Sequence, residues 1–308
     1  MTKNEAFKRW RVQEPFVNLH CLLGEGPYYE KTTHSLRFVD IRKQQLHTVP
    51  LHTPELAHTI QLDEPVSVTA DVEGINPTHK ILVALKYGLA ILDRSVGRYE
   101  YTHRFPRNES MRSNDGAVDP SGQFWVGTMS DFGIWPLQPL GALYRMNHTT
   151  TQKILGGLTI PNAVGWSPNH TTMYFTNTTA RQILAFEYSA EISNQRVLYQ
   201  HTGPGEPDGF RVDVEGNLWQ AIYAEGRVVK ISPDGQIIGE VLLPTRNVTC
   251  TQFVGTQLFV TSGEDTDGED ESRNYGGGLF CVDVGVEGLQ PFCFQMARQE
   301  DATTIDGA

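Results

Sequence analysis

Short apolar runs separated by turns recur along the chain, and helical periodicity is hard to find between them. The first run of each repeated unit covers residues 36–39, 81–84, 124–126, 173–175, 218–221 and 258–260. A second run follows at residues 46–49, 89–92, 142–145, 183–186, 228–231 and 278–282. Successive first runs lie about 40–50 residues apart, which is the spacing of propeller blades. Each unit is therefore expected to contain a strand, a turn and a further strand.

Six such units fill the chain with no linker between them. The pattern predicts an all-β, six-bladed β-propeller of four-stranded antiparallel blades, with residues 1–308 as a single domain. A polar lead-in with a first short strand is expected over residues 1–20, and a polar tail is expected after Met296. A pair of β-sandwiches or a β-helix is the alternative, but sandwich strands recur faster and β-helix coils are shorter.

One polar phrase occurs several times in these units. Asp208 precedes a second aspartate, Asp213, by five positions, and a glycine turn and an apolar run follow. Asn114 and Asn162 hold the place of Asp208 in two similar phrases, and Glu25 holds it in a looser one. In a propeller, equivalent positions of different blades face each other across the axis. The four side-chain oxygens are therefore expected to converge at one mouth of the central channel.

Two carboxylates and two amide oxygens form a hard, all-oxygen set of ligands. Such a set favours Ca²⁺ or Mg²⁺, and less strongly Mn²⁺, over thiophilic metals. The competing interpretation is that each residue only caps a turn, since Asp-Gly and Asn-Asp-Gly are common in turns. Their shared position in the repeat favours a cation site with open positions for water and substrate.

Composition narrows the class of protein. The formal net charge of -11 disfavours nucleic acid and anionic membranes as partners, because both are bound by clustered Lys and Arg. The N-terminus lacks the apolar run of a signal peptide, so the expected location is the cytoplasm. The four cysteines show no zinc-site spacing and are expected to be buried thiols in strands. The acidic run over residues 262–271 is expected to be a solvated excursion.

Several motifs, taken in order, resemble the family of calcium-dependent propellers that includes senescence marker protein (regucalcin) and gluconolactonase. The motifs are Gly24-Glu25-Gly26-Pro27, Phe38-Val39-Asp40-Ile41, Arg112-Ser113-Asn114-Asp115-Gly116, Gly127-Thr128-Met129, Gly141-Ala142-Leu143-Tyr144, Pro207-Asp208-Gly209 and Gly276-Gly277-Gly278-Leu279-Phe280. The family-like region covers about residues 20–295. The resemblance implies one divalent cation, with Ca²⁺ expected first and Mg²⁺, Mn²⁺ and Zn²⁺ left open.

The resemblance also implies roles for individual residues. The direct ligands of the cation would be Glu25, Asn162 and Asp208. Asn114 would lie nearby, touching substrate or a water on the cation, and Arg112 would contact substrate. Many members carry a substrate-binding acid after the Gly-Thr-Met motif, and Asp131 is the candidate here, displaced by one position.

The activity that the resemblance implies is opening of an aldonolactone, such as a gluconolactone, to the aldonic acid. The cation would act as a Lewis acid, and Asp208 would orient or deprotonate the attacking water. The chain would then be a hydrolase of carboxylic ester bonds with a small sugar lactone as its partner molecule. The alternatives are a calcium-dependent aryl-ester or organophosphate hydrolase, a calcium-binding regulatory protein without turnover, and a propeller that serves as an interaction platform. No Gly-x-Ser-x-Gly motif is present, which argues against a serine esterase.

Overall fold

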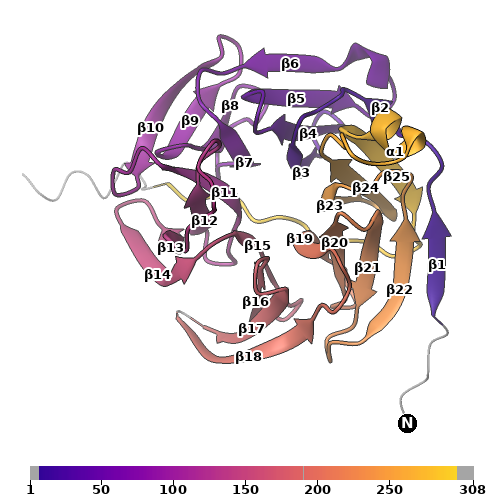
Figure 1. Cartoon of the computed structure of the whole chain (residues 1–308). Coiled ribbons are helices and arrows are strands. Elements are labelled where there is room, and N and C mark those ends of the chain that lie inside the picture. Colours follow the sequence, from indigo (N-terminus) through magenta and orange to yellow (C-terminus); the bar gives the residue numbers. More distant parts are fainter. Residues whose placement is uncertain (1–6, 190, 297–308) are drawn as a thin grey trace, which may run out of the picture.

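A computed structural model describes residues 7–189 and 191–296. Within these residues the strands form six sheets arranged as blades around a central axis, which confirms the predicted propeller (Figure 1). Each predicted apolar run lies in the second or third strand of a blade. The predicted tail after Met296 lies outside the described residues. No helix in the described part of the chain is long and apolar enough to cross a membrane.

The blades are numbered in chain order, and each is given from its innermost strand outward. Blade 1 contains β3 (Gly24–Glu30), β4 (Ser35–Asp40), β5 (Gln45–Pro50) and β6 (His58–Gln61). Blade 2 contains β7 (Val66–Ala70), β8 (Lys80–Leu85), β9 (Gly88–Asp93) and β10 (Arg98–Arg104). Blade 3 contains β11 (Met111–Val118), β12 (Phe124–Ser130), β13 (Gly141–Met146) and β14 (Thr151–Leu158).

The remaining blades follow the same order, and two of them recruit the N-terminal strands. Blade 4 contains β15 (Pro161–Trp166), β16 (Thr172–Asn177), β17 (Gln182–Tyr188) and β18 (Ile192–Gln200). Blade 5 contains β19 (Glu206–Val212), β20 (Leu218–Tyr223), β21 (Arg227–Ile231), β22 (Ile237–Leu242) and β1 (Lys8–Arg11). Blade 6 contains β23 (Val248–Val254), β24 (Gln257–Ser262), β25 (Gly278–Asp283) and β2 (Val17–Asn18).

The N-terminal segment closes the ring. β2 pairs antiparallel with β25, so the outermost strand of blade 6 comes from the start of the chain. β1 adds to the outer edge of blade 5 in parallel with β22. Pairing β2 with β25 in one blade links the segment before blade 1 to blade 6 and so fixes the last blade against the first.

The apolar core lies between neighbouring blades. Six clusters of buried side chains occur in the described residues, and each is drawn from two adjacent blades. Trp125 and Trp219 are fully buried in two of them. Because a strand at the second or third position of a blade is covered on both faces, its sequence reads as a continuous apolar run.

The acidic segment and the cysteines differ in part from expectation. A short helix, α1 (Asp270–Tyr275), begins within the end of the acidic run, and Asp265 in the run is buried against Arg246. A short 3₁₀ turn also occurs at η1 (Pro54–Leu56).

The four cysteines are free thiols, but the expectation of buried strand positions is wrong for three of them. Cys21 is buried outside a strand, Cys281 is half-buried, and Cys293 is exposed outside a strand.

All six innermost strands share an irregularity close to their starting ends. The register with the second strand of the blade shifts once in each of them. Such β-bulges turn side chains away from the regular alternation of a strand. The shift lies between Ser113 and Gly116 in β11, and between Pro207 and Phe210 in β19. The bulges therefore decide which side chains face the axis.

Candidate metal centre and its surroundings

Three of the predicted residues lie at or beside these bulges, at the starting ends of three innermost strands. Glu25 is the second residue of β3, Asn162 the second residue of β15 and Asp208 the third residue of β19. All three side chains are buried. Blades 1, 4 and 5 thus each contribute one oxygen-bearing side chain to the same end of the axis.

Asn162 leaves one ligand atom free. Its amide nitrogen donates hydrogen bonds to the carboxylate of Asp208 and to the hydroxyl of Thr178, the latter at 3.2 Å. Its amide oxygen is buried and has no hydrogen-bond partner in the described part of the chain. A buried acceptor without a partner costs about 1–3 kcal/mol, so it is expected to bind a group from outside the chain. A cation would satisfy this oxygen.

Three carboxylates lie close together here and have perturbed pKa values. Burial and the negative charges of Asp208 and Asp115 raise the pKa of Glu25 well above its usual range. Burial and the charge of Asp115 likewise raise the pKa of Asp208. Burial raises the pKa of Asp115. A divalent cation beside these groups would favour their charged forms and lower all three pKa values.

Asn114 is engaged in hydrogen bonds next to this cluster. Its amide oxygen accepts a hydrogen bond from Arg112 at 3.0 Å, and its amide nitrogen donates to the carbonyl of Pro161 at 3.0 Å. It thereby ties blade 3 to blade 4. Asn114 thus lies directly beside Asn162 in the neighbouring blade, and its place near a cation and its role towards substrate stay predictions.

Arg112 is a buried cation with donors still available. One terminal nitrogen donates to Ser113 and Asn114, while the Nε atom is buried and has no partner in residues 7–189 and 191–296. The centroid of the Phe132 ring lies 4.4 Å from the guanidinium carbon of Arg112. Burial lowers the pKa of Arg112 to about 10, so the group remains positively charged at neutral pH. A buried guanidinium with a free N–H is suited to bind an oxygen of a substrate.

Asp131 lies beside Arg112 rather than in the carboxylate cluster. Its negative charge acts on Arg112, and its carboxylate forms an ion pair with Lys86 at 2.6 Å. The backbone N–H of Phe132 also donates to it at 2.8 Å. Asp131 is thus already paired, and its predicted contact with substrate is not tested by this arrangement.

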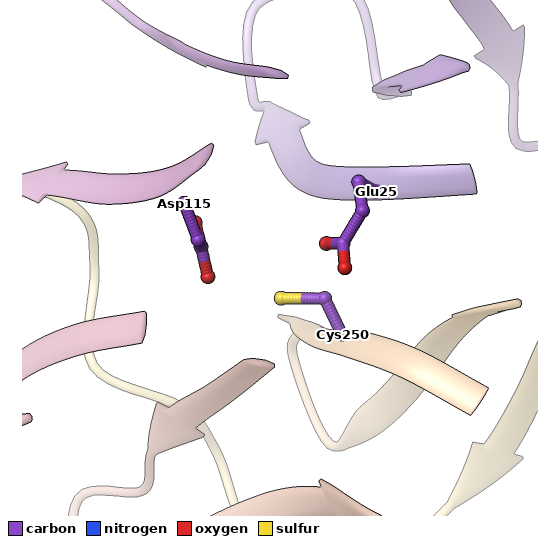
Figure 2. A group of neighbouring side chains, drawn as sticks. All are labelled: Glu25, Asp115 and Cys250. Atoms are coloured by element: carbon purple, nitrogen blue, oxygen red, sulfur yellow. The ribbon is translucent and has the colours of Figure 1, made fainter. Parts of the chain in front are cut away.

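The sequence analysis missed two residues of this region, Asp115 and Cys250. Figure 2 shows both beside Glu25, and one ligand atom of each of the three lies within 4.8 Å of the others. Strict alternation along β11 would place Asp115 on the opposite face from Asn114. The bulge between Ser113 and Gly116 removes that alternation. Asp115 could have been predicted because it directly follows Asn114 in the chain. Cys250 could have been predicted because it lies near the start of the innermost strand of blade 6.

Comparisons with known proteins identify the family of the chain. Residues 23–264 match the family model described as SMP-30/Gluconolactonase/LRE-like region. Regucalcin of Oryctolagus cuniculus is 32% identical over 295 residues, covering 90% of this chain and 95% of the relative. L-arabinolactonase of Azospirillum brasilense is 33% identical over 284 residues, covering 87% of this chain and 90% of the relative.

A solved structure shows the same fold. The crystal structure of a calcium-binding protein, regucalcin, from Agrobacterium tumefaciens superimposes with a TM-score of 0.83 at 26% identity. The superposition covers 94% of this chain and 99% of that chain. The chain belongs to the SMP-30/gluconolactonase/LRE-like family.

Proposed function

We propose that this chain is a cation-dependent lactonase that hydrolyses a sugar lactone to the aldonic acid. One observation carries the proposal: within the described residues the buried amide oxygen of Asn162 has no hydrogen-bond partner, while the amide nitrogen of the same group donates to Asp208, one of the crowded carboxylates. The names of the relatives supply the substrate class, because the Azospirillum brasilense relative is an L-arabinolactonase.

The donor set fits a hard divalent cation. Glu25 and Asp208 offer carboxylate oxygens and Asn162 offers an amide oxygen, which are ligand types that Ca²⁺ prefers. The similar regucalcin from Agrobacterium tumefaciens is described as calcium-binding, which supports Ca²⁺ as the ion. When bound, the cation would supply Lewis-acid stabilisation of negative charge.

The chain's own groups would position the lactone and the water. Asp208 would orient the attacking water and accept its proton, and the hydrogen bond from Asn162 fixes the Asp208 carboxylate for that task. Arg112 would donate its unused N–H to an oxygen of the substrate, while Asn114 holds the guanidinium in place. Asp131 would accept a hydrogen bond from a sugar hydroxyl at the outer side of Arg112.

Exclusion of water strengthens these contacts. Arg112 and the three acids are almost completely buried, so charges act on one another through a medium of low polarity. A substrate oxygen that replaces water beside Arg112 would therefore feel the full effect of the guanidinium.

A direct test is lactone hydrolysis followed in a pH-stat, which measures the proton released with each aldonic acid. We expect turnover of a sugar lactone that is lost with a chelator and restored by Ca²⁺. Glu25→Gln is expected to lose activity that ordinary Ca²⁺ concentrations do not restore. Activity that survives complete removal of cations would contradict the proposal.

A second function is favoured by the similarity to a calcium-binding regucalcin, namely calcium binding without turnover. The same experiment separates the two. Tight Ca²⁺ binding with no hydrolysis across a broad panel of sugar lactones would support the regulatory function. Faster hydrolysis of an aryl ester or organophosphate than of any lactone would instead support the esterase alternative.

A further inference from the structure

The bulges place a second layer of residues directly after the first along the innermost strands. In blades 3 to 6 the bulge lies in the innermost strand. There, two residues of that strand stand between the paired residue before the bulge and the paired residue after it. The first residues of the four pairs are Asn114, Asn162, Asp208 and Thr249. The second residues are Asp115, Ala163, Gly209 and Cys250, and we call these four the second layer.

Two members of the second layer are small, so the backbone of their strands comes close to the polar members. A Cβ atom at Gly209 would lie 2.3 Å from the sulfur of Cys250, so only a glycine fits beside this thiol. Ala163 adds only a methyl group. The polar members are Asp115 and Cys250, and Glu25 reaches them from blade 1 (Figure 2).

The ligand atoms of this group are free for coordination. Asp115 accepts a hydrogen bond from the N–H of Gly116 at one oxygen, and its other oxygen is buried without a partner among the described residues. One oxygen of Glu25 likewise accepts from the N–H of the next residue, Gly26. The sulfur of Cys250 has long contacts, at 3.8 Å to the carbonyl of Thr251 and 3.9 Å to Arg211.

We propose that Glu25, Asp115 and Cys250 form a second cation site that selects a thiophilic divalent ion, Zn²⁺ or a chemically similar metal. Zinc takes carboxylate and thiolate ligands together, at about 2.0–2.3 Å, in a four-coordinate arrangement. Tetrahedral ligand atoms are then roughly 3.4–3.6 Å apart. The three ligand atoms here lie within 4.8 Å of one another, so a contraction of up to about 1.3 Å would bring them to this spacing, with a water as the fourth ligand.

Glu25 belongs to both proposed sites and would bridge the two cations, while the other ligands separate this site chemically from the oxygen site that Asn162 marks. Ca²⁺ takes six to eight oxygen ligands, which a group with one sulfur and two carboxylates does not supply. A thiolate instead selects zinc or another soft ion. Coordination releases the thiol proton of Cys250 to solvent, as metal binding by cysteine requires.

The charges around the site also favour a bound cation. Glu25, Asp115 and the thiolate of Cys250 bring three negative charges, the neighbouring Asp208 adds a further one, and the nearby Arg211 brings one positive charge. Arg211 is held by the carbonyls of Phe210 and Pro27, at 2.9 and 3.3 Å. A divalent ion would offset part of the remaining negative charge.

The test uses Co²⁺ as a spectroscopic substitute for Zn²⁺, added to the full-length protein in excess Ca²⁺. Binding at Cys250 is expected to give a near-ultraviolet thiolate-to-cobalt absorption band that saturates at one equivalent and disappears when Zn²⁺ is added. Cys250→Ser is expected to abolish the band. Asp115→Asn keeps the size of the side chain and is expected to weaken Co²⁺ binding by at least about tenfold.

Two controls separate this site from other thiols and from the proposed lactonase centre. Cys281→Ser and Cys293→Ser are expected to keep the band. Asn162→Ala is expected to lose Ca²⁺ affinity and lactone hydrolysis but to keep the band, so either proposal can fail alone. No band in the wild type, a band that persists in Cys250→Ser, or unchanged Co²⁺ affinity in Asp115→Asn would overturn the proposal.

Discussion

Glu25, Asp115 and Asp208 interact electrostatically in a region from which water is almost excluded. Like charges in such a region raise each other's pKa and destabilise the fully ionised form. The nearby arginines, Arg112 and Arg211, offset part of this charge. At the scale of single residues, the cluster therefore favours either protonation or a bound cation.

Replacing Asp208 tests its assigned role. Asp208→Asn keeps the shape of the side chain but removes a ligand charge and the proton acceptor, so kcat/KM for a lactone should fall by about 10²–10⁴-fold. The melting temperature of the cation-free variant should rise, because one of three crowded carboxylates is gone. Glu206→Gln, two residues earlier in β19, is the matched control and should keep most activity. Full activity in Asp208→Asn would refute the role.

The raised pKa values also predict how cation affinity depends on pH. Protons compete with the cation for the same carboxylates, and a raised pKa means that they compete at higher pH than usual. Ca²⁺ affinity should therefore fall as pH decreases from about 8 to about 5. The stability of the cation-free protein depends on pH in the opposite direction. Because its folded state binds these protons more tightly than the unfolded state, the cluster increases the free energy of unfolding as pH falls. Calorimetric Ca²⁺ titrations that show no pH dependence would contradict this.

At the scale of strands, the two acids of the repeated phrase have different tasks. Asp208 lies at the axis, whereas Asp213 accepts hydrogen bonds from the turn that follows and from the indole N–H of Trp219 at 2.9 Å. Asp119 does the same for Trp125 at 2.8 Å. The two acids are five residues apart, which is the length of strand between the axial end, where Asp208 lies, and the hairpin at the other end, where Asp213 lies.

Removing the second acid should affect stability alone. Asp213→Ala leaves the buried indole N–H of Trp219 without a partner, which should lower the free energy of unfolding by roughly 1–3 kcal/mol. Urea denaturation measures the change. Ca²⁺ affinity per folded molecule should stay as in the wild type, since Asp213 does not reach the axis. A large loss of affinity in a folded variant would show that the two acids are coupled.

The strands differ in how readily the sequence reveals them. Second and third strands, such as β8 and β24, are covered on both faces and read as apolar runs. Outer strands such as β10 and β18 are exposed and carry mixed polar residues, so their pattern resembles that of loops. β2 contains only two residues, and its pairing with β25 depends on closure of the ring.

The site could be predicted only as far as the repeat could be read. Glu25, Asn162 and Asp208 share a place in the phrase, and the structure brings them to one end of the axis. The positions of Asp115 and Cys250 at the axis depend on a bulge in each of their strands. Such a bulge shifts the pairing with the neighbouring strand by one residue, and no sequence pattern marks it clearly.

At the scale of the whole molecule, the proposed cation would join blades that are distant in the chain. Glu25, Asn162 and Asp208 belong to blades 1, 4 and 5, while β2 closes the ring at blade 6. A cation that binds only the folded ring should stabilise it by about 2.7 kcal/mol at a free concentration of 100 times Kd. Added Ca²⁺ should therefore raise the Tm of the wild-type protein in thermal unfolding, and it should leave the Tm of Asn162→Ala unchanged. An equal rise in both proteins would place the stabilising ion elsewhere.

The proposed cation site is tested most directly by a crystal structure grown with Mn²⁺ in place of Ca²⁺ and soaked with an aldonic acid, with the ion located by its anomalous scattering. We expect an anomalous peak coordinated by Glu25, Asn162 and Asp208, with the sugar acid between this ion and Arg112. An ion bound away from these three side chains, or an acid bound at another part of the propeller, would contradict it.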